Sequence, residues 1–460
     1  MTEAISISIN NLVLFDCDDT EIDDTEIVRL IFSDKDLLSK PDYEEGEFYK
    51  KYTYKTSVRR AKERLDVMQF GEAYFKEVFN TNIYNAIDYT DYLLHLGVNS
   101  SDHYEVFKEK VENNEVTFEK WQSALANIIN YELINGNIKS WENETDKGLS
   151  INSECDKLIY YSFKEPLQEN YYGLFSWKIH EAFVIRQILE SCKETDEIEF
   201  NIYLELADVA PNEYDYFDGT DIINDLLMKG IPGFERTIVV VEGIRDQEIL
   251  QYAMEKLFPH LSELFYFMEF QDEEGLKREG GTSFIIKNIK AFLFARIRRN
   301  FIAIFDNDAE GYSAKCQLLN YRKSWPENFR ILLYPKIEQF NAYPTYAPDD
   351  SILTIDINKR ACSIELYLPD SFIKSESKNN PIESKYYPIE WEARKKIKTE
   401  DGQDKYFYQG VISNKGVIGK KFDDFLKSEK KNKKVFVEEE WGRMKMLLES
   451  IVFAFSEKSR

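Results

Sequence analysis

The sequence has few of the residues that build zinc sites, disulfide frameworks or histidine-based active sites. Its 460 residues include only four histidines and five cysteines. The cysteines are scattered without a Cys-x-x-Cys pair, at Cys17, Cys155, Cys192, Cys316 and Cys362. This spacing argues against a zinc site and predicts reduced thiols in a cytosolic protein.

Long apolar runs and targeting signals are also missing. No run of 18 apolar residues occurs, so the sequence predicts no membrane span. The first residues, Met-Thr-Glu-Ala-Ile-Ser, lack the basic and apolar regions of a signal peptide, and we therefore expect a cytoplasmic protein. The Walker A pattern is absent as well, so any ATP hydrolysis would have to come from a companion protein.

The net charge of −24 argues against nonspecific coating of nucleic acid. Charge is nevertheless segregated along the chain, because residues 371–434 contain 16 Lys and Arg against 10 Asp and Glu. A second basic cluster consists of Arg296, Arg298 and Arg299. These segments are candidates for a nucleic-acid-binding groove, and the alternative is a solvated basic surface.

The first half of the chain predicts a mainly helical α+β domain over residues 1–232. Alternating apolar residues at 5–9 and 12–15 predict a strand pair with Asn10-Asn11 as its turn. Apolar residues at helical spacing predict helices within 57–80, 101–134 and 177–186, and residues 198–204 predict a further strand.

A short acidic motif follows the first strand pair. Asp16-Cys17-Asp18-Asp19-Thr20 resembles the opening motif of the haloacid-dehalogenase phosphatases. That resemblance implies a nucleophilic Asp16 and a general acid at Asp18. Before residue 230, however, no convincing later Lys or strand-end acidic pair completes such a site. The phosphatase is therefore the less favoured hypothesis.

The second half of the chain has the rhythm of an α/β fold. The break at Lys229-Gly-Ile-Pro-Gly233 predicts a domain boundary. Beyond it, apolar segments alternate with helical ones, and they predict a parallel four-stranded sheet flanked by helices, with strands at 237–241, 264–268, 301–305 and 329–334. We expect one domain over 233–372 and a basic extension over 373–460 that packs on it; the acidic residues described next make 233–372 the candidate catalytic domain.

Carboxylates follow the predicted strands at the points where they end. Glu242 closes the first strand and Asp246 lies one helical turn later, whereas Asp306 and Asp308 close the third. Glu365 stands in a further apolar segment. Because the carboxyl ends of parallel strands meet at one edge, these five groups are predicted to converge. They would repel one another without a cation, which favours one or two Mg²⁺ or Mn²⁺ ions and hydrolysis of a phosphodiester.

The spacing of these acids resembles that of a known fold. Two motifs stand about sixty residues apart, Val-Val-Val-Glu242-Gly243-x-x-Asp246 and Phe-Asp306-Asn-Asp308-Ala-x-Gly311. They resemble the Toprim domain of topoisomerases, bacterial primases and the overcoming-lysogenization-defect (OLD) nucleases, over about residues 236–370. The resemblance implies that Glu242 is the general acid/base and that Asp306 and Asp308 hold Mg²⁺. Asp246 and Ser363-Ile-Glu365 are similar to the additional acids of the OLD nucleases, which implies a two-metal nuclease.

A second resemblance extends over more of the chain. The N-terminal strand pair and several later segments resemble the bacterial HEPN/Toprim-associated proteins, namely 64–68, 280–283, 343–345 and 362–368. This likeness implies a role in antiphage or mobile-element defence, with a companion protein and a homo-oligomeric assembly as expected partners. No Arg lies four to six residues before any histidine, so the HEPN ribonuclease pattern is missing and the first half is interpreted as a scaffold or sensor.

The sequence therefore predicts a metal-dependent nuclease, with a non-cleaving nucleic-acid-binding or scaffold protein as the alternative. DNA and RNA both remain open as substrates. The residues predicted to contact the substrate are Gly243, Gly280, Gly281, Thr282, Ser283 and Lys415. Each site residue also has a simpler interpretation: a helix cap for Glu242, a surface position for Asp246, a buried ion pair for Glu365, a turn for Gly280 and Gly281, and a loop lysine for Lys415.

Overall fold

The computed structural model describes residues 2–10, 12–17, 26–38, 49–82, 103–135, 153, 155, 181–205, 235–270, 280–347, 349–375, 386–431 and 435–456. The chain forms two compact units, which consist mainly of Met1–Phe234 and Glu235–Phe455. Each unit is described by itself below. Within the described ranges, no helix is long and apolar enough to cross a membrane.

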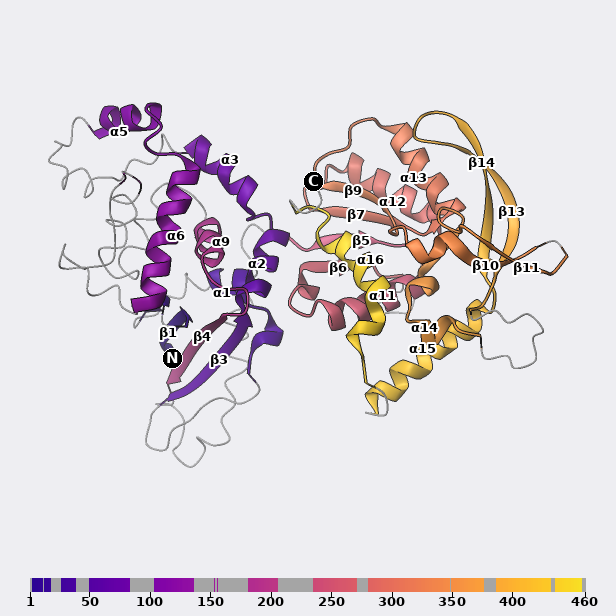
Figure 1. Cartoon of the computed structure of the whole chain (residues 1–460), viewed down its shortest axis with the longest axis horizontal. Coiled ribbons are helices and arrows are strands. Elements are labelled where there is room, and N and C mark those ends of the chain that lie inside the picture. The colour runs from indigo at the N-terminus through magenta and orange to yellow at the C-terminus, as the bar shows by residue number, and fades with distance from the viewer. Residues whose placement is uncertain are drawn as a thin grey trace. The chain divides into compact units, whose positions relative to one another are not determined.

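The first unit contains an antiparallel sheet and a group of helices (Figure 1). The strands stand in the order β2-β1-β4-β3, with β1 Thr2–Ile9, β2 Leu12–Cys17, β3 Tyr49–Ser57 and β4 Glu197–Glu205. The helices are α1 Glu26–Ile31, α2 Val58–Val67, α3 Glu72–Asn82, α5 His103–Glu112, α6 Phe118–Asn135 and α9 Glu181–Glu190. The predicted strand pair is confirmed, with Asn10 in the left-handed region at φ 51°.

Buried aromatic rings and one charged motif hold the helices of the first unit together. Phe75 of α3 stacks on Phe183 of α9 with ring centroids 5.2 Å apart. In the 64–68 segment, the Arg64 guanidinium donates to the carbonyl oxygen of Arg29 at 2.7 Å, and the Asp66 carboxylate accepts from the Arg186 guanidinium at 2.8 Å. This motif therefore ties α2 to α1 and α9.

Asp16 lies inside strand β2 of this antiparallel sheet, where it is paired with Ser6. A binding crevice forms at the carboxyl ends of parallel strands, and β2 is an outer strand of a sheet in which every pairing is antiparallel. Residues 18–20 of the phosphatase-like motif lie outside the described residues. The position of Asp16 therefore gives the phosphatase hypothesis no support.

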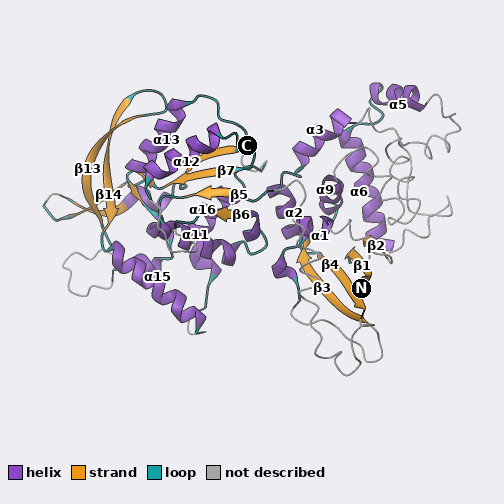
Figure 2. Ribbon diagram, turned by 180° about the vertical axis from the view of Figure 1, so that it is seen from behind, coloured by secondary structure: helices purple, strands orange, loops and turns teal. Residues whose placement is uncertain are grey.

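The second unit is built on a parallel four-stranded sheet in the order β6-β5-β7-β9 (Figure 1 and Figure 2). Its strands are β5 Thr237–Val240, β6 Phe265–Phe267, β7 Phe301–Phe305 and β9 Phe329–Leu333, and the predicted parallel sheet is confirmed. Helices α12 Thr282–Phe294 and α13 Ala309–Tyr321 cover one face, and α11 Ile244–Leu257 and α16 Gly442–Val452 lie on the other. Every residue of β5 and β7 is buried, as strands covered on both faces require.

Two smaller groups of strands complete the second unit. A mixed sheet has the order β11-β10-β13-β14, with β10 Tyr343–Tyr346, β11 Ile352–Ile355, β13 Ile389–Lys398 and β14 Asp404–Ile412. A two-stranded pair joins β8 Asn307–Asp308 to β12 Ala361–Cys362. The remaining described helices of this unit are α14 Asp370–Ile373 and α15 Lys415–Lys430, together with short 3-10 turns at Ser262–Leu264, Glu338–Ala342, Ile364–Tyr367 and Glu438–Trp441. The first unit has one such turn among its described residues, at Asp34–Asp36.

Candidate acidic site at the carboxyl edge of the sheet

Glu242 and Asp306 follow neighbouring strands of the parallel sheet. Val240 of β5 is in register with Ala303 of β7, so both strands end at the same edge. There the backbone amide of Asp306 donates a hydrogen bond of 3.0 Å to Oε1 of Glu242. The side chain of Glu242 is therefore fixed to the end of the adjacent strand, and its Oε2 atom is left for other partners.

Asp308 caps helix α13 and is held from two sides. Its Oδ1 accepts from the amide of Gly311 at 2.7 Å, and its Oδ2 accepts from Nε2 of Gln409 at 2.7 Å. Gln409 belongs to β14, and its Oε1 in turn accepts from the amide of Glu310 at 2.9 Å. Asp308 is thus a helix cap, as the residue type favours, and its carboxylate also joins the β13–β14 ribbon to the acidic group.

Two glycines allow the backbone to pack closely around these acids. A Cβ atom at Gly311 would lie 2.2 Å from the carbonyl oxygen of Asp306, and one at Gly280 would lie 2.7 Å from the carbonyl oxygen of Glu242. The amide of Gly281, at φ 87°, donates to that same oxygen of Glu242 at 2.6 Å. The loop at Gly280 and Gly281 therefore supports the backbone of Glu242.

The other predicted substrate contacts lie at the beginnings of two helices. Gly243 is the N-cap of α11, and Thr282 and Ser283 begin α12. The hydroxyl of Thr282 lies 3.4 Å from Oε1 of Glu310. These positions place backbone amides near the acidic group, and phosphate contact by them stays a prediction.

Glu365 reaches the same region through the pairing of β12 with β8. Ala361 is opposite Asp308, so the turn that follows β12 lies beside the end of β7. The side chain of Glu365 is almost fully buried, and its Oε2 accepts from the hydroxyl of Ser363 at 2.7 Å. Its Oε1 lies 3.2 Å from Nζ of Lys415, the first residue of α15, whose side chain is 53% exposed. Both Glu365 and Lys415 therefore border the acidic group.

The electrostatics show that these carboxyl groups share one environment. Burial, and then the negative charge of Asp308, raise the pKa of Glu242 to about 8. Burial, and then the charge of Glu365, raise the pKa of Asp246 to about 7. Burial also raises the pKa of Asp308, although the hydrogen bonds that it accepts oppose this. Asp246 is therefore a member of the cluster, and it is buried rather than a surface residue.

Asp306 has the most strongly perturbed environment of the group. Burial raises its pKa well above the ordinary range, and the charges of Asp246 and Glu242 raise it further. For Lys415, burial alone would lower the pKa, but the charges of Glu365 and Asp306 outweigh it and the pKa is raised. One atom of Asp306, Oδ1, is buried and has no hydrogen-bond partner. A buried, unpartnered carboxylate oxygen requires a ligand or a proton.

The donor set suits a hard divalent cation, because carboxylate oxygens are the preferred ligands of Mg²⁺ and Mn²⁺. The buried Oδ1 of Asp306, which has no hydrogen-bond partner, is one carboxylate oxygen that such an ion would bind. As the side chains stand, however, no group of three or more His, Cys, Asp or Glu residues in the described part of the chain is arranged to hold a metal ion. The carboxylates converge without forming a complete ligand shell.

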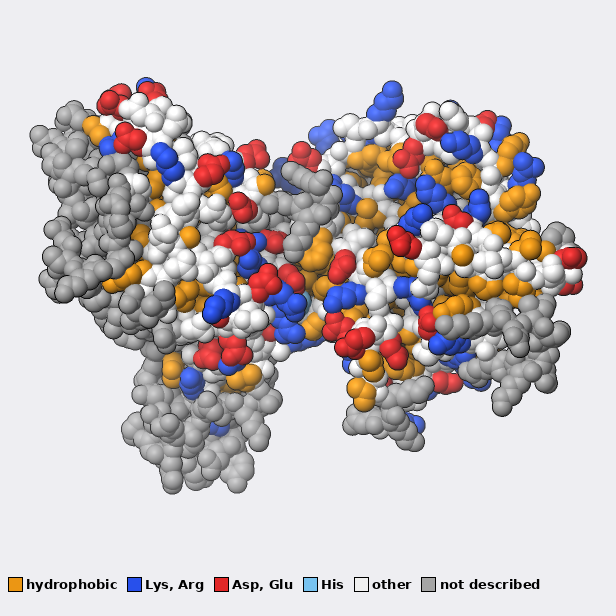
Figure 3. Space-filling model, in the orientation of Figure 1, with side chains coloured by type: hydrophobic (Ala, Val, Ile, Leu, Met, Phe, Trp, Pro, Cys, Tyr) orange, Lys and Arg blue, Asp and Glu red, His pale blue; other side chains and the backbone are white. Residues whose placement is uncertain are grey.

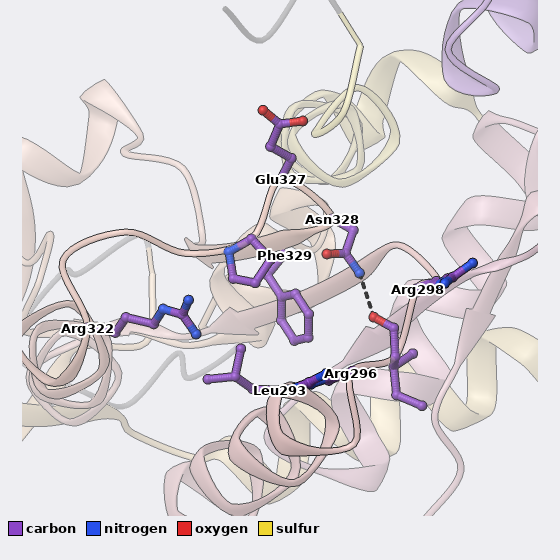
Figure 4. Close-up of a pocket in the computed structure, with 9 residues that line it drawn as sticks. Leu293, Arg296, Arg298, Arg322, Glu327, Asn328 and Phe329 are labelled. Carbon is purple, nitrogen blue, oxygen red and sulfur yellow. Dashed lines mark hydrogen bonds between the residues drawn. The ribbon is translucent and has the colours of Figure 1, made fainter.

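A separate hollow of about 620 Å³ lies at the opposite edge of the sheet, where strand β9 begins (Figure 4). Arg296, Arg298 and Arg322 border it, together with Glu327. Arg296 follows the C-terminal end of α12 and Arg322 that of α13, where the helix dipole favours positive charge. The predicted basic cluster is therefore accounted for in part by helix termination, at the edge away from the acids.

The comparisons with known proteins concern the first unit. Residues 1–214 match the family model described as HEPN/Toprim N-terminal domain 1. The match supports the HEPN/Toprim-associated family. No curated protein and no solved structure matches the chain. The matched segment ends before β5, so the acidic residues of the second unit lie outside it. The family name suggests an enzyme that acts on nucleic acid, and the roles of individual residues remain to be proposed.

Sequence reasoning missed two residues of the site. Gln409 binds Asp308 but follows a largely exposed stretch of β14, where a buried glutamine has no sequence signal. Tyr334 is buried, and burial followed by the charges of Asp246 and Asp306 raises its pKa well above the ordinary range. Tyr334 directly follows β9, so the rule that placed the acids at strand ends could also have found it.

Proposed function

We propose that the second unit is a Toprim-type catalytic domain that hydrolyses phosphodiester bonds of DNA or RNA with Mg²⁺ or Mn²⁺. The observation that carries the proposal is the convergence of Glu242, Asp246, Asp306, Asp308 and Glu365 from separate chain segments around a buried, unpartnered oxygen of Asp306. Such a group of acids is stable only with protons or cations. The order of the acids after parallel strands agrees with the OLD-type pattern of the sequence.

Each acidic residue has a distinct part in this proposal. Asp306, Asp308 and Glu242 would hold one divalent ion, and Asp246 with Glu365 would hold a second. When bound, such an ion supplies Lewis-acid activation of water and neutralises charge on the phosphate. Glu242, with a pKa of about 8, can exchange a proton near neutral pH through its Oε2 atom.

Lys415 supplies positive charge at the edge of the same site. Its ammonium group is half-exposed and pairs with Glu365 on one side, so its remaining donors are available to an anionic phosphate oxygen. The glycine loop at 280–281 keeps Glu242 in place beside it. We place this activity in antiphage or mobile-element defence in the cytoplasm, with a companion protein or ATPase and a homo-oligomeric assembly.

A non-cleaving nucleic-acid-binding subunit is the second candidate function. It is favoured by one observation: the described acidic residues do not form a ready ligand group for a metal. In this alternative the carboxyl groups stay protonated in part, as their raised pKa values allow, and the site has no catalytic role.

The test is incubation of the full chain with plasmid DNA, single-stranded DNA and total tRNA, each with Mg²⁺, Mn²⁺ or EDTA. We expect cleavage of at least one substrate with metal, none with EDTA, and loss of cleavage in Asp308→Ala and Glu242→Gln. Asp349→Asn, at an exposed aspartate of the same unit, is the matched control and should cleave normally. Cleavage that survives in Glu242→Gln and Asp308→Ala contradicts the assignment, and binding without cleavage supports the second candidate.

A further inference from the structure

Strands β13 and β14 form a long antiparallel ribbon with two different faces. Directly opposed residues share a face, and successive residues alternate between faces. On the inner face, Phe407 contacts the ring of Tyr312 in α13 at 5.3 Å, and Gln409 bonds Asp308 of the acidic site. Lys395, opposite Phe407, pairs with Glu310 at 3.0 Å. The inner face is therefore fixed to the catalytic half of the second unit.

The outer face combines exposed aromatic rings with positive charge. Tyr406 and Tyr408 are 57% and 54% exposed, so both rings face solvent. Their cross-strand partners are Lys396 and Arg394, and the Arg394 guanidinium lies over the ring of Tyr406 at 4.0 Å from its centroid. Figure 3 shows Lys and Arg side chains beside side chains of the hydrophobic class, which includes Tyr and Trp, over this part of the surface.

A third ring extends the row toward the base of the ribbon. Trp391 lies next to Tyr408, with ring centroids 6.3 Å apart. Trp391 is opposite Gly410, and a Cβ atom at Gly410 would lie 2.9 Å from the indole ring. The glycine thus leaves room for the indole to lie across the ribbon. We call the row formed by Trp391, Tyr408 and Tyr406, with Arg394 and Lys396 beside it, the aromatic stripe.

The chemistry of the aromatic stripe matches that of single-stranded nucleic acid. Unpaired bases stack on exposed aromatic rings whatever their sequence, and nearby arginine and lysine neutralise the phosphates. A duplex hides the faces of its bases, so it cannot use the rings in this way. Asp404 of this face pairs with Lys396 at 2.7 Å and offsets its charge, so Arg394 is the main cation that the stripe offers to a phosphate.

The aromatic stripe is also continuous with the acidic site. Gln409 stands between Tyr408 of the stripe and Gly410, and its own side chain donates to Asp308 on the other face. β14 is the outermost strand of its sheet, and at the base of the ribbon the amide of Gly410 donates to the carbonyl oxygen of Arg360 at 3.0 Å, which joins β14 to the segment beside Asp308. We propose that the outer face of β13 and β14 binds single-stranded DNA or RNA by base stacking and leads it to the acidic site. This inference rests on the proposed nuclease function and specifies its substrate class.

The test measures binding by fluorescence anisotropy, with the full chain, EDTA to prevent cleavage, and labelled dT and rU oligonucleotides of about 20 nucleotides beside a duplex of equal length. Tyr406→Ala and Tyr408→Ala should each weaken single-strand binding about fivefold or more, and the double variant more than either. Tyr406→Phe and Tyr408→Phe keep the ring and should bind like the wild type. Duplex binding should be weaker than single-strand binding and should change little.

The matched control is Tyr321→Ala. Tyr321 is 50% exposed and lies under the ammonium of Lys290 at 4.5 Å, so it reproduces an exposed tyrosine with a cation on its ring at another surface. It should leave oligonucleotide binding unchanged. The inference is overturned if the Tyr406 and Tyr408 double variant binds single strands within twofold of the wild type, if Tyr321→Ala weakens binding equally, or if the duplex binds as tightly as the single strand.

A second measurement separates this inference from the proposed function. Metal-dependent hydrolysis of bis(p-nitrophenyl) phosphate, a phosphodiester without bases, requires the acidic site and not the aromatic stripe. Normal hydrolysis in the double variant, together with weak oligonucleotide binding, supports both proposals. Normal hydrolysis with unchanged oligonucleotide binding overturns the stripe and leaves the nuclease. Absence of hydrolysis in the wild type, with intact and tyrosine-dependent oligonucleotide binding, overturns the catalytic function alone.

Discussion

Oε1 of Glu242 accepts a hydrogen bond from the backbone amide of Asp306, although 64 residues separate them in the sequence. The bond joins the ends of two adjacent parallel strands and fixes one carboxylate beside the next. It lowers the pKa of Glu242, yet burial and the neighbouring carboxylates outweigh it and raise that pKa to about 8. The geometry therefore holds together groups that repel each other when charged.

The first prediction concerns stability and pH. The pKa of Glu242 is about 8 in the folded protein against an ordinary 4.5, so the folded state binds the proton more tightly. The protonated Glu242 side chain therefore stabilises the folded state. This stabilisation is full below about pH 4.5 and is lost as the pH rises through about 8. Glu242→Gln cannot ionise, so the variant does not lose this stability at high pH. In thermal unfolding at pH 9 with EDTA, its Tm should be higher than that of the wild type by roughly 2–4 °C for each kcal/mol of stability retained. The difference should shrink at pH 5, and a difference that grows toward pH 5 contradicts the burial of a charged group.

The second prediction compares two glycines. In Gly311→Ala the new Cβ meets the carbonyl oxygen of Asp306 at 2.2 Å, so the start of α13 must shift. We expect a loss of about 1–3 kcal/mol in the free energy of unfolding and loss of nuclease activity. In Gly416→Ala the Cβ has no atom within 4 Å, and a helical Gly-to-Ala change stabilises by up to about 1 kcal/mol. Urea unfolding measures both, and equal effects would falsify the close packing around Asp306.

Most of the sheet of the second unit could be predicted from the sequence because its signals are local. Continuous β-branched and aromatic runs such as 237–241 and 301–305 identify strands buried on both faces, and the helices between them require parallel pairing. The convergence of Glu242 with Asp306 follows from that pairing alone. Asp246 follows as well, because one helical turn separates it from the strand end.

The contacts that could not be predicted depend on distant pairing. Gln409 reaches Asp308 only because β14 lies against α13, and no local pattern fixes that arrangement. The sequence predicts a turn or a phosphate contact for the glycine loop but not its support of the Glu242 backbone, which the structure shows; the phosphate contact stays a prediction. Tyr406 and Tyr408 are exposed, whereas Phe407 between them packs on Tyr312, and this alternation likewise depends on the register of β13 with β14.

The third prediction concerns Gln409. Gln409→Leu removes the donor to Oδ2 of Asp308 and the acceptor for the amide of Glu310. Because the hydrogen bond from Gln409 opposes the upward shift of the Asp308 pKa, that pKa should rise further and the pH optimum of cleavage should move to higher pH. The pH–rate profile is the measurement. Gln403→Leu, at an exposed glutamine of the turn before β14, is the control and should keep the wild-type profile; an unmoved profile in Gln409→Leu refutes the assigned contact.

The fourth prediction concerns the pair of Lys415 and Glu365. Lys415→Met leaves the almost fully buried Glu365 carboxylate without its cation, while Ser363 still donates to it. We expect a loss of roughly 1–2 kcal/mol in the free energy of unfolding at pH 8; the loss is kept small because solvent screens the half-exposed Lys415 charge. Cleavage should be slower by at least about tenfold. Lys420→Met, an exposed lysine on the same helix, should change neither. Equal behaviour of the two variants in unfolding and cleavage assays argues against a role for Lys415 at the site.

The central claim is that the converging carboxylates bind a divalent cation, and Mn²⁺ binding tests it most directly. Electron paramagnetic resonance of free Mn²⁺ gives the number of bound ions, and thermal unfolding gives the accompanying stabilisation. The wild type should bind one or two ions and gain roughly 5 °C or more in Tm at a hundredfold excess over Kd. Asp306→Asn should bind at least one ion fewer than the wild type and gain less in Tm, and Asp349→Asn should match the wild type in both. If Asp306→Asn binds Mn²⁺ with the stoichiometry and Tm shift of the wild type, the acidic cluster is not the metal site.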